Sequence, residues 1–118
     1  MKYLMLVMME PLDEPVPGED DVEPWVRRHD ESGVRVFGDR LAPARQATTV
    51  RMRSTGRIVT PGPFAQRHEQ IAGLDVLECT SMDHAVQVAL EHPMARLGAI
   101  EIRPFYDWDA VEPSPATP

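Results

Sequence analysis

The chain has few of the residues from which reactive sites are most often built. Its 118 residues include one cysteine, and aromatic side chains make up 6% of the sequence. One thiol excludes an internal disulfide, which suits a reducing compartment, and we expect a cytoplasmic protein. Cys79 lies in an apolar run with no basic neighbour, so it is expected to be a small buried hydrophobe rather than a nucleophile.

Positive charge is also in short supply. Twelve Lys and Arg stand against nineteen Asp and Glu, for a formal net charge of -7. Phosphate backbones and anionic lipid surfaces both need a clustered basic footprint, so neither nucleic acid nor a membrane is expected as a partner.

Long apolar runs and familiar nucleotide or nucleophile motifs are missing. The run Tyr3 to Met9 is too short to cross a bilayer and has no small-residue cleavage site behind it. There is no phosphate loop, no Gly-rich dinucleotide turn and no Gly-x-Ser-x-Gly elbow. No metal-like spacing links the four histidines, so neither a metal nor a cofactor is expected.

The length predicts one domain, over residues 1–105, followed by a proline-rich tail at 106–118 that we expect to lack regular structure. Residues 10–23 are acidic and carry three prolines, which is typical of a solvated loop. Residues 2–9 are apolar on both alternating faces, so the strand predicted there needs cover on both sides.

The middle of the chain predicts a helix, a strand and a hairpin. Val22, Trp25, Val26 and His29 have helical spacing, Asp20 and Asp21 can cap the start, and Gly33 ends the helix. His29 is interpreted as a histidine at the edge of the core. A strand follows over 34–41. Residues 48–60 predict a β-hairpin, with Val50 and Met52 on one face, Arg51 and Arg53 on the other, and the turn at Ser54-Thr55-Gly56.

The last third repeats the pattern of strand, helix and strand. A strand is expected over 71–79. After it, Thr80, Ser81 and Asp83 offer an N-cap and, three residues after Thr80, a carboxylate, which is the arrangement of a capping box. Met82, Ala85, Val86 and Ala89 form the apolar stripe of the second helix, which Pro93 ends, while His84 and His92 are expected to be exposed. In the final strand, 99–104, Ile100 and Ile102 share one face and Glu101 and Arg103 the other. The element order predicts an α+β ferredoxin-like domain with both helices on one face of the sheet.

Several short motifs in this order resemble the YCII-related family, also called the DGPF domain. They are Pro61-Gly62-Pro63-Phe64 with Ala65, Glu69 and Gly73; Ser81 to Ala85; Glu101 to Pro104; the opening Met1 to Leu6; and Ala47 to Arg51. The resemblance covers roughly residues 1–105. It implies a homodimeric α/β-barrel, in which two ferredoxin-like sheets face each other around a cleft.

The family resemblance also suggests functions, with one departure. Relatives include a dehalogenating lyase-type enzyme, and others resemble companions of extracytoplasmic-function sigma factors. The family's turn carboxylate is Pro61 here, and proline cannot transfer a proton, so that chemistry does not carry over. The turn motif Pro61, Gly62, Pro63 and Phe64 is therefore interpreted mainly as a structural corner.

The candidate site consists of side chains expected at the intersubunit cleft. Arg51, Arg103 and Glu101 are candidate ligand-binding residues, and His68 and Glu69 are candidate acid–base groups. The alternative is that Glu101 and Arg103 pair with each other or with Arg51, and that His68 is solvated.

The leading hypothesis is a small cytoplasmic homodimer that binds an anionic or aromatic molecule in this cleft, with or without weak cofactor-free acid–base or lyase-type activity. The alternatives are a non-catalytic module that regulates transcription with a sigma-factor-like partner, and a cofactor-independent monooxygenase.

Overall fold

The computed structural model describes residues 1–9, 21–64 and 70–110. The elements in chain order are β1 (Lys2–Met9), α1 (Glu23–Glu31), β2 (Arg35–Arg40), the 3-10 turn η1 (Ala44–Gln46), β3 (Thr48–Arg53), β4 (Gly56–Pro61), β5 (Gln70–Glu78), α2 (Met82–Leu90), α3 (Met94–Leu97) and β6 (Ala99–Pro104). The predicted order of strands, helices and hairpin is confirmed, and η1 and α3 are additions. Most of the predicted acidic loop, the predicted His68 and Glu69, and residues 111–118 of the tail lie outside the described residues.

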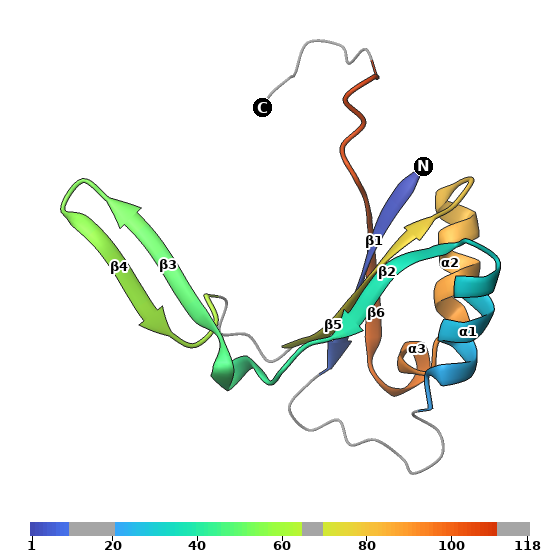
Figure 1. Ribbon diagram of the computed structural model, residues 1–118, viewed down its shortest axis with the longest axis horizontal. Coiled ribbons are helices and arrows are strands. Elements are labelled where there is room, and N and C mark those ends of the chain that lie inside the picture. Colours follow the sequence, from blue (N-terminus) through green and yellow to red (C-terminus); the bar gives the residue numbers. More distant parts are fainter. Residues whose placement is uncertain (10–20, 65–69, 111–118) are drawn as a thin grey trace.

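Four strands form one antiparallel sheet in the order β2-β5-β1-β6 (Figure 1). Each helical connection passes over one intervening strand: α1 links β1 to β2 across β5, and α2 with α3 links β5 to β6 across β1. This split arrangement is the ferredoxin-like α+β fold. Its assembly into a dimeric barrel involves a second chain and stays a prediction.

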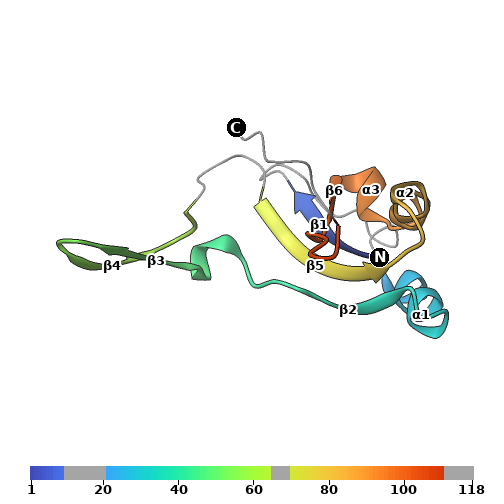
Figure 2. The same cartoon turned by 90° about the horizontal axis from the view of Figure 1, so that it is seen from above.

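The helices lie on one side of this sheet (Figure 2). Along β1, the side chains of Tyr3, Met5 and Val7 are buried against the helices. The alternate side chains, Leu4, Leu6 and Met8, point to the other face of the sheet and are half-buried. The register pairs Leu4 with Val76 and Leu6 with Leu74 of β5, so the second face is apolar as well. We call this second face the open face.

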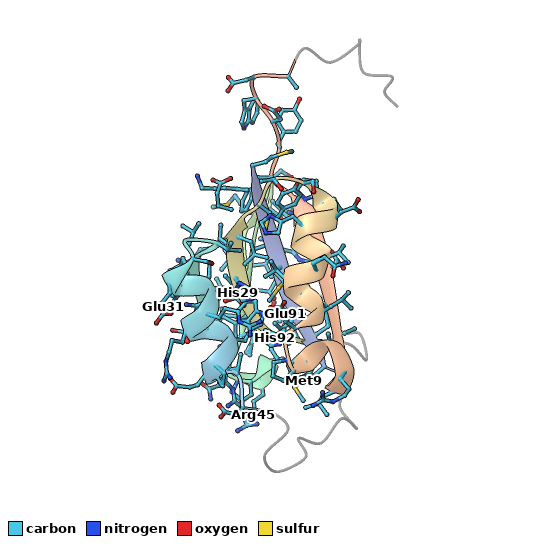
Figure 3. The ribbon with its side chains drawn as sticks, turned by 90° about the vertical axis from the view of Figure 1, so that its right-hand side faces the viewer. Met9, His29, Glu31, Arg45, Glu91 and His92 are labelled. Carbon is cyan, nitrogen blue, oxygen red and sulfur yellow. The ribbon has the colours of Figure 1, made fainter. Side chains whose placement is uncertain are left out.

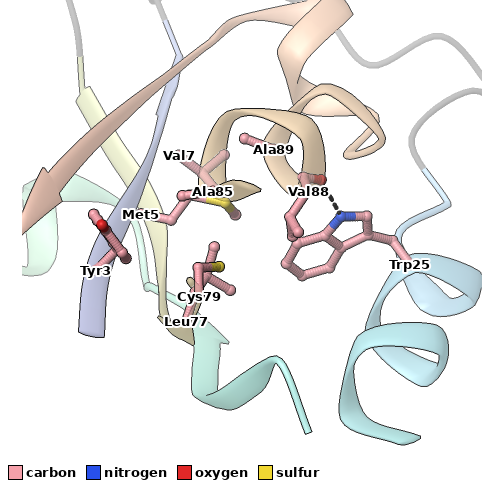
Figure 4. Packing of buried hydrophobic residues seen from close by; sticks show 9 residues of the cluster. All are labelled: Tyr3, Met5, Val7, Trp25, Leu77, Cys79, Ala85, Val88 and Ala89. Atoms are coloured by element: carbon pink, nitrogen blue, oxygen red, sulfur yellow. Dashed lines mark hydrogen bonds between the residues drawn. The ribbon is translucent and has the colours of Figure 1, made fainter. Parts of the chain in front are cut away.

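The core forms between β1, β5 and the two longer helices (Figure 4). Met5 and Leu77 are fully buried, and Ala85, Val88 and Ala89 of α2 pack against them. Small residues on α2 let the helix approach the sheet closely, and burial of these apolar side chains supplies the main stabilisation of the fold.

Trp25 connects the two helices. Its ring is 5% exposed, and the indole Nε1 donates a hydrogen bond of 2.9 Å to the carbonyl oxygen of Val88 (Figure 4). A buried indole N–H needs such a partner, so α1 and α2 are held by both packing and a directional bond. Cys79 is buried and free, as expected from its apolar surroundings, and burial raises the pKa of its thiol.

The start of α2 differs from the predicted capping box. Ser81, not Thr80, is the N-cap, and its hydroxyl accepts a hydrogen bond of 3.1 Å from the backbone N–H of His84. The ring Nδ1 of His84 accepts a bond of 3.1 Å from the backbone N–H of Thr80 in return. A histidine thus takes the reciprocal role that the sequence assigned to Asp83, because the helix begins one residue later than expected.

The buried face of α2 and the region after it also correct the sequence prediction. Met82 and Val86 are 38% and 37% exposed, and Val88 takes their place in the core. The buried stripe of α2 therefore consists of Ala85, Val88 and Ala89. Pro93 does not simply end α2, since it caps the short helix α3, and this second turn places His92 in the interior instead of at the surface.

The β3–β4 hairpin stands apart from the four-stranded sheet, and we call it the arm. In Figures 1 and 2 it projects from the side of the sheet that lies opposite the helices. Its register pairs Val50 with Val59 and Met52 with Arg57 on one face, and Arg51 with Ile58 on the other. The turn places Gly56 at a φ of 127°, a conformation that glycine adopts without strain. The predicted hairpin and its two faces are confirmed.

Candidate functional site

A cavity of about 810 Å3 lies between the helices and the sheet at the ends of β1 and β5. Apolar walls come from Val7, Met9, Val22, Val26, Ile71 and Met94, and polar groups come from Arg35, Asp39, Arg40, Gln70, Asp75 and His92. Its size and mixed lining suit a small organic molecule with a polar head. This cavity lies within one chain, on the helix side of the sheet.

A largely buried ion pair forms one wall. Arg35 of β2 donates from Nε to Oδ1 of Asp75 on β5 over 2.7 Å, and its side chain is 14% exposed. The other guanidinium nitrogens donate to Asp30 at 3.0 Å and to the carbonyl oxygen of Gly38 at 2.7 Å. Arg35 is therefore fully engaged, and its charge is offset by two carboxylates.

Burial in an otherwise apolar strand destabilises the ionised form of Asp75. Burial raises the pKa of its carboxyl, and this effect outweighs the opposing hydrogen bond and charge of Arg35. For Arg35, burial acts to lower the pKa, but the contacts with Asp75 and Asp30 raise it overall. Because each ion is the main compensation for the other, removal of either one leaves a buried charge without its partner.

His92 offers a neutral hydrogen-bond donor to the cavity. It is 6% exposed, and burial lowers the pKa of its ring to about 4. Its Nδ1 accepts a bond of 3.0 Å from the backbone N–H of Met94. In the neutral ring the proton must then sit on Nε2, which remains for a ligand. At neutral pH this histidine is suited to donate a hydrogen bond to an oxygen.

Arg40 is the cation of the cavity without a charged partner in the described part of the chain. The register pairs it with Gly73, opposite Val7, and so places it on the helix side of the sheet. Its neighbour Asp39 pairs with Leu74 on the other face of the strand but also borders the cavity, and its Oδ1 accepts a bond of 2.7 Å from the Arg40 backbone N–H. The Arg40 guanidinium is thus positioned to attract an anionic group to the cavity.

A second histidine lies next to the cavity. His29 of α1 contacts Oε1 of Glu91 through Nε2 at 3.0 Å, and Arg28 reaches the same oxygen at 3.1 Å. Figure 3 shows His29, Glu91 and His92 close together where α1 faces the end of α2. The ring of Trp25 separates the two histidines, with centroids 5.0 Å from His29 and 4.7 Å from His92. His29 is a core-edge histidine, as predicted, and it does not line the cavity.

The site residues predicted from the sequence occupy other places. Arg51 lies on the arm, where its guanidinium sits 4.7 Å from the ring centre of Phe64, a cation–π contact. Glu101 and Arg103 pair with Leu6 and Leu4 of β1 and therefore lie on the open face. Within the described residues neither forms an ion pair, with the other or with Arg51. A single chain does not bring these three residues together, and their joint role at an intersubunit cleft stays a prediction.

The turn after β4 has a structural role. Gly62 adopts a φ of 98°, and its backbone N–H donates a bond of 2.7 Å to the carbonyl oxygen of Ala47. The hydroxyl of Thr49 donates to the carbonyl oxygen of Gly62, also at 2.7 Å. Both bonds close the base of the arm. Pro61 is the last residue of β4, so the position of the family's carboxylate is part of the arm here.

Sequence reasoning missed the cavity residues, although one signal was present. Asp75 stands at an inward position of a strand that is otherwise apolar, and a buried carboxylate needs a cationic partner. That rule would have pointed to Arg35 on the neighbouring strand. No comparable signal marks His92 or Arg40, because their placement depends on α3 and on the bulged pairing of β2 with β5.

Two negative findings apply to the described residues. No helix among them is long and apolar enough to cross a bilayer. They also contain no group of three or more His, Cys, Asp or Glu side chains arranged to hold a metal ion.

The comparisons with known proteins agree with one another. The family model described as the YCII-related domain matches residues 1–109. An uncharacterised protein of Rhizobium meliloti (strain 1021) is 34% identical over 87 residues, which covers 72% of this chain and 70% of that protein.

Proposed function

Since this chain belongs to the YCII-related family, we propose that it binds a small anionic molecule with an apolar or aromatic body in the cavity between its helices and its sheet. The observation that carries the proposal is that one cavity is lined both by Arg40, which has no charged partner in the described residues, and by the neutral donor His92. A guanidinium and a neutral N–H together suit a carboxylate, a phenolate or a sulfonate.

Binding is favoured over turnover by the state of the titratable groups. His92 has a pKa of about 4, so it is a poor proton acceptor near pH 7. Asp75 is held by Arg35 at 2.7 Å. Acid–base or lyase-type activity with His68 and Glu69 therefore stays a prediction, as does the alternative of a sigma-factor-like partner, which no contact of the described residues favours.

The test uses two fluorescent probes of similar shape. 1-Anilinonaphthalene-8-sulfonate carries a negative charge, and N-phenyl-1-naphthylamine is its neutral counterpart. Arg40→Ala is expected to weaken binding of the sulfonate at least fivefold and to change binding of the neutral probe less than twofold. Arg57→Ala on the arm removes the same charge away from the cavity and is the matched control.

A second variant tests the location. Val26→Phe narrows the cavity from α1 and is expected to weaken both probes, while far-UV circular dichroism shows that the fold is retained. Equal binding of the sulfonate by the wild type and Arg40→Ala would contradict the proposed role of Arg40. Unchanged binding of both probes to Val26→Phe would place the binding site elsewhere.

We also propose that the protein acts as a homodimer, and the open face supports this proposal. Leu4, Leu6, Leu74 and Val76 form an apolar strip that no helix of the described chain covers, and Phe37 beside it is 61% exposed. An apolar sheet face of this kind is most simply covered by the same face of a second copy. Light scattering should give a dimer at micromolar concentration, and Leu6→Glu should give a monomer. A monomeric wild type would overturn this part.

A further inference from the structure

The arm exposes apolar side chains that the rest of its own chain does not cover. Val50 is 69% exposed, Met52 72% and Val59 53%, and all three lie on one face of the hairpin. A two-stranded hairpin is marginally stable alone in water, so a hairpin with an uncovered apolar face needs a surface to pack against. Inside the described part of the chain, that face has no such surface.

The charge of the arm differs in sign from that of the whole chain. The arm, residues 48–61, contains three arginines and neither Asp nor Glu, in a chain of net charge -7. The open face of the sheet carries two acidic residues, Asp39 and Glu101, and one basic residue, Arg103, none of which has an ion-pair partner among the described residues. The basic arm is complementary in charge to the acidic body of a second copy of this chain. It would be repelled by a basic partner.

The direction of the arm also favours a second copy of the chain as its partner. In both views the arm projects from the side of the sheet opposite the helices, which is the side on which a copy covering the open face would sit (Figures 1 and 2). Six residues in each strand give the arm a length of about 20 Å. This is long enough to extend along a neighbouring sheet of the same size.

We propose that the arm of each protomer embraces the other, with the face formed by Val50, Met52 and Val59 packed against the body of the partner copy. This inference rests on the homodimer of the proposed function and adds the arm to its interface. Two-fold symmetry makes the two arm contacts equivalent, so the assembly closes at two chains.

The decisive variants lie on opposite faces of the same strand of the arm. Val59→Glu puts a charge on the packed face and is expected to raise the dimer dissociation constant at least tenfold. Ile58→Glu is the matched control, because it makes the same type of change one residue away on the other face, and it should raise the constant less than threefold. Sedimentation equilibrium over a dilution series measures both.

Hydrogen exchange distinguishes the surface on which the arm rests. The amides of residues 48–60 should be protected in the wild-type dimer and should lose protection in monomeric Leu6→Glu. Equal protection in that monomer would show that the arm rests on its own chain and would overturn the inference. Fast exchange in the dimer would overturn it as well.

The outcomes separate this inference from the homodimer on which it rests. If the wild type is a dimer and Val59→Glu dimerises as tightly, the arm contact is wrong and the sheet-face dimer stands. If the wild type is monomeric at every concentration, both fail together.

Discussion

The body and the arm of this protein are both made of β-strands, but they bury their side chains very differently. In the body, Met5 and Leu77 are fully buried between sheet and helices, whereas on the arm Val50 and Met52 remain 69% and 72% exposed. Alternation of apolar and polar residues is present in both regions, so the pattern alone does not determine burial. A strand buries its apolar face only where another layer lies over it.

The largest expected effect tests the body directly. Leu77→Ala should destabilise the protein by about 2–5 kcal/mol, because it leaves a cavity in the fully buried core. Val50→Ala on the arm should change stability by less than about 0.5 kcal/mol in protein dilute enough to be monomeric. Urea denaturation followed by circular dichroism measures both, and similar losses would break the comparison between body and arm.

Acidification should weaken the body through His92. Burial lowers the pKa of this ring to about 4, below its ordinary value of 6.5. Between these two values the unfolded chain binds more protons, so stability is complete above pH 6.5 and falls as the pH drops toward 4. The contribution is on the order of 3 kcal/mol at most.

The pH effect is separated from other titrations by a variant. His92→Asn keeps an acceptor for the Met94 N–H but does not titrate, so its stability should fall less than that of the wild type between pH 7 and pH 5. His84→Asn serves as the control and should keep the wild-type slope. A wild-type slope in His92→Asn would show that the ring does not resist protonation in the folded state.

The ion pair of the cavity gives the next effect. A Cβ on Gly38 would lie 1.9 Å from Oδ1 of Asp75, so Gly38→Ala must push this carboxylate away from Arg35. The expected loss is about 1–3 kcal/mol in thermal or urea unfolding, as for a buried polar group deprived of its bond. The arm offers a contrast, since Thr60→Ala should have little effect at its exposed position. A neutral Gly38→Ala would mean that the pair tolerates displacement.

The smallest effect distinguishes two ways to start a helix. Ser81→Ala should cost about 0.5–2 kcal/mol, because it removes the acceptor for the His84 N–H. Thr80→Ala should cost less, since the Thr80 backbone N–H keeps its bond of 3.1 Å to Nδ1 of His84 and only the longer contact of the hydroxyl, at 3.4 Å, is lost. The opposite order of effects in urea unfolding would restore the cap predicted from the sequence.

The fold was predictable because its signals are local. The doubly apolar first strand, the Ser-Thr-Gly turn of the arm and the alternation of Ile100 and Ile102 with Glu101 and Arg103 each specify an element within a few residues. The ferredoxin-like order then follows from the sequence of elements. The buried face of α2 was predicted only in part: Ala85 and Ala89 are in the core as expected, but Val88 was missed, and Met82 and Val86 are partly exposed.

The candidate site was less predictable because its residues meet only in the folded chain. Arg40 lies on β2, Asp75 on β5 and His92 between α2 and α3, and nothing in their local sequence relates them. His92 is buried because α3 follows directly after Pro93. This helix has four residues, which is too short for a sequence pattern to predict it. The alternation of polar and apolar side chains along the strands predicted the faces of Arg51, Glu101 and Arg103 correctly. It could not show that the three residues do not meet in one site of a single chain.

The base of the arm has a consequence for protein engineering. The chain leaves the sheet after Leu41, whose backbone N–H still donates to the carbonyl oxygen of Ala72 over 2.8 Å, and it re-enters on β5, the strand next to β2. The segment between β2 and β5, which contains the arm, therefore starts and ends on neighbouring antiparallel strands. A short turn could connect these two strands without changing the order of any strand. Since closing a loop of twice the length costs only about 0.6 kcal/mol more, this position should accept grafted hairpins or peptides of varied length and make the body a carrier for foreign segments.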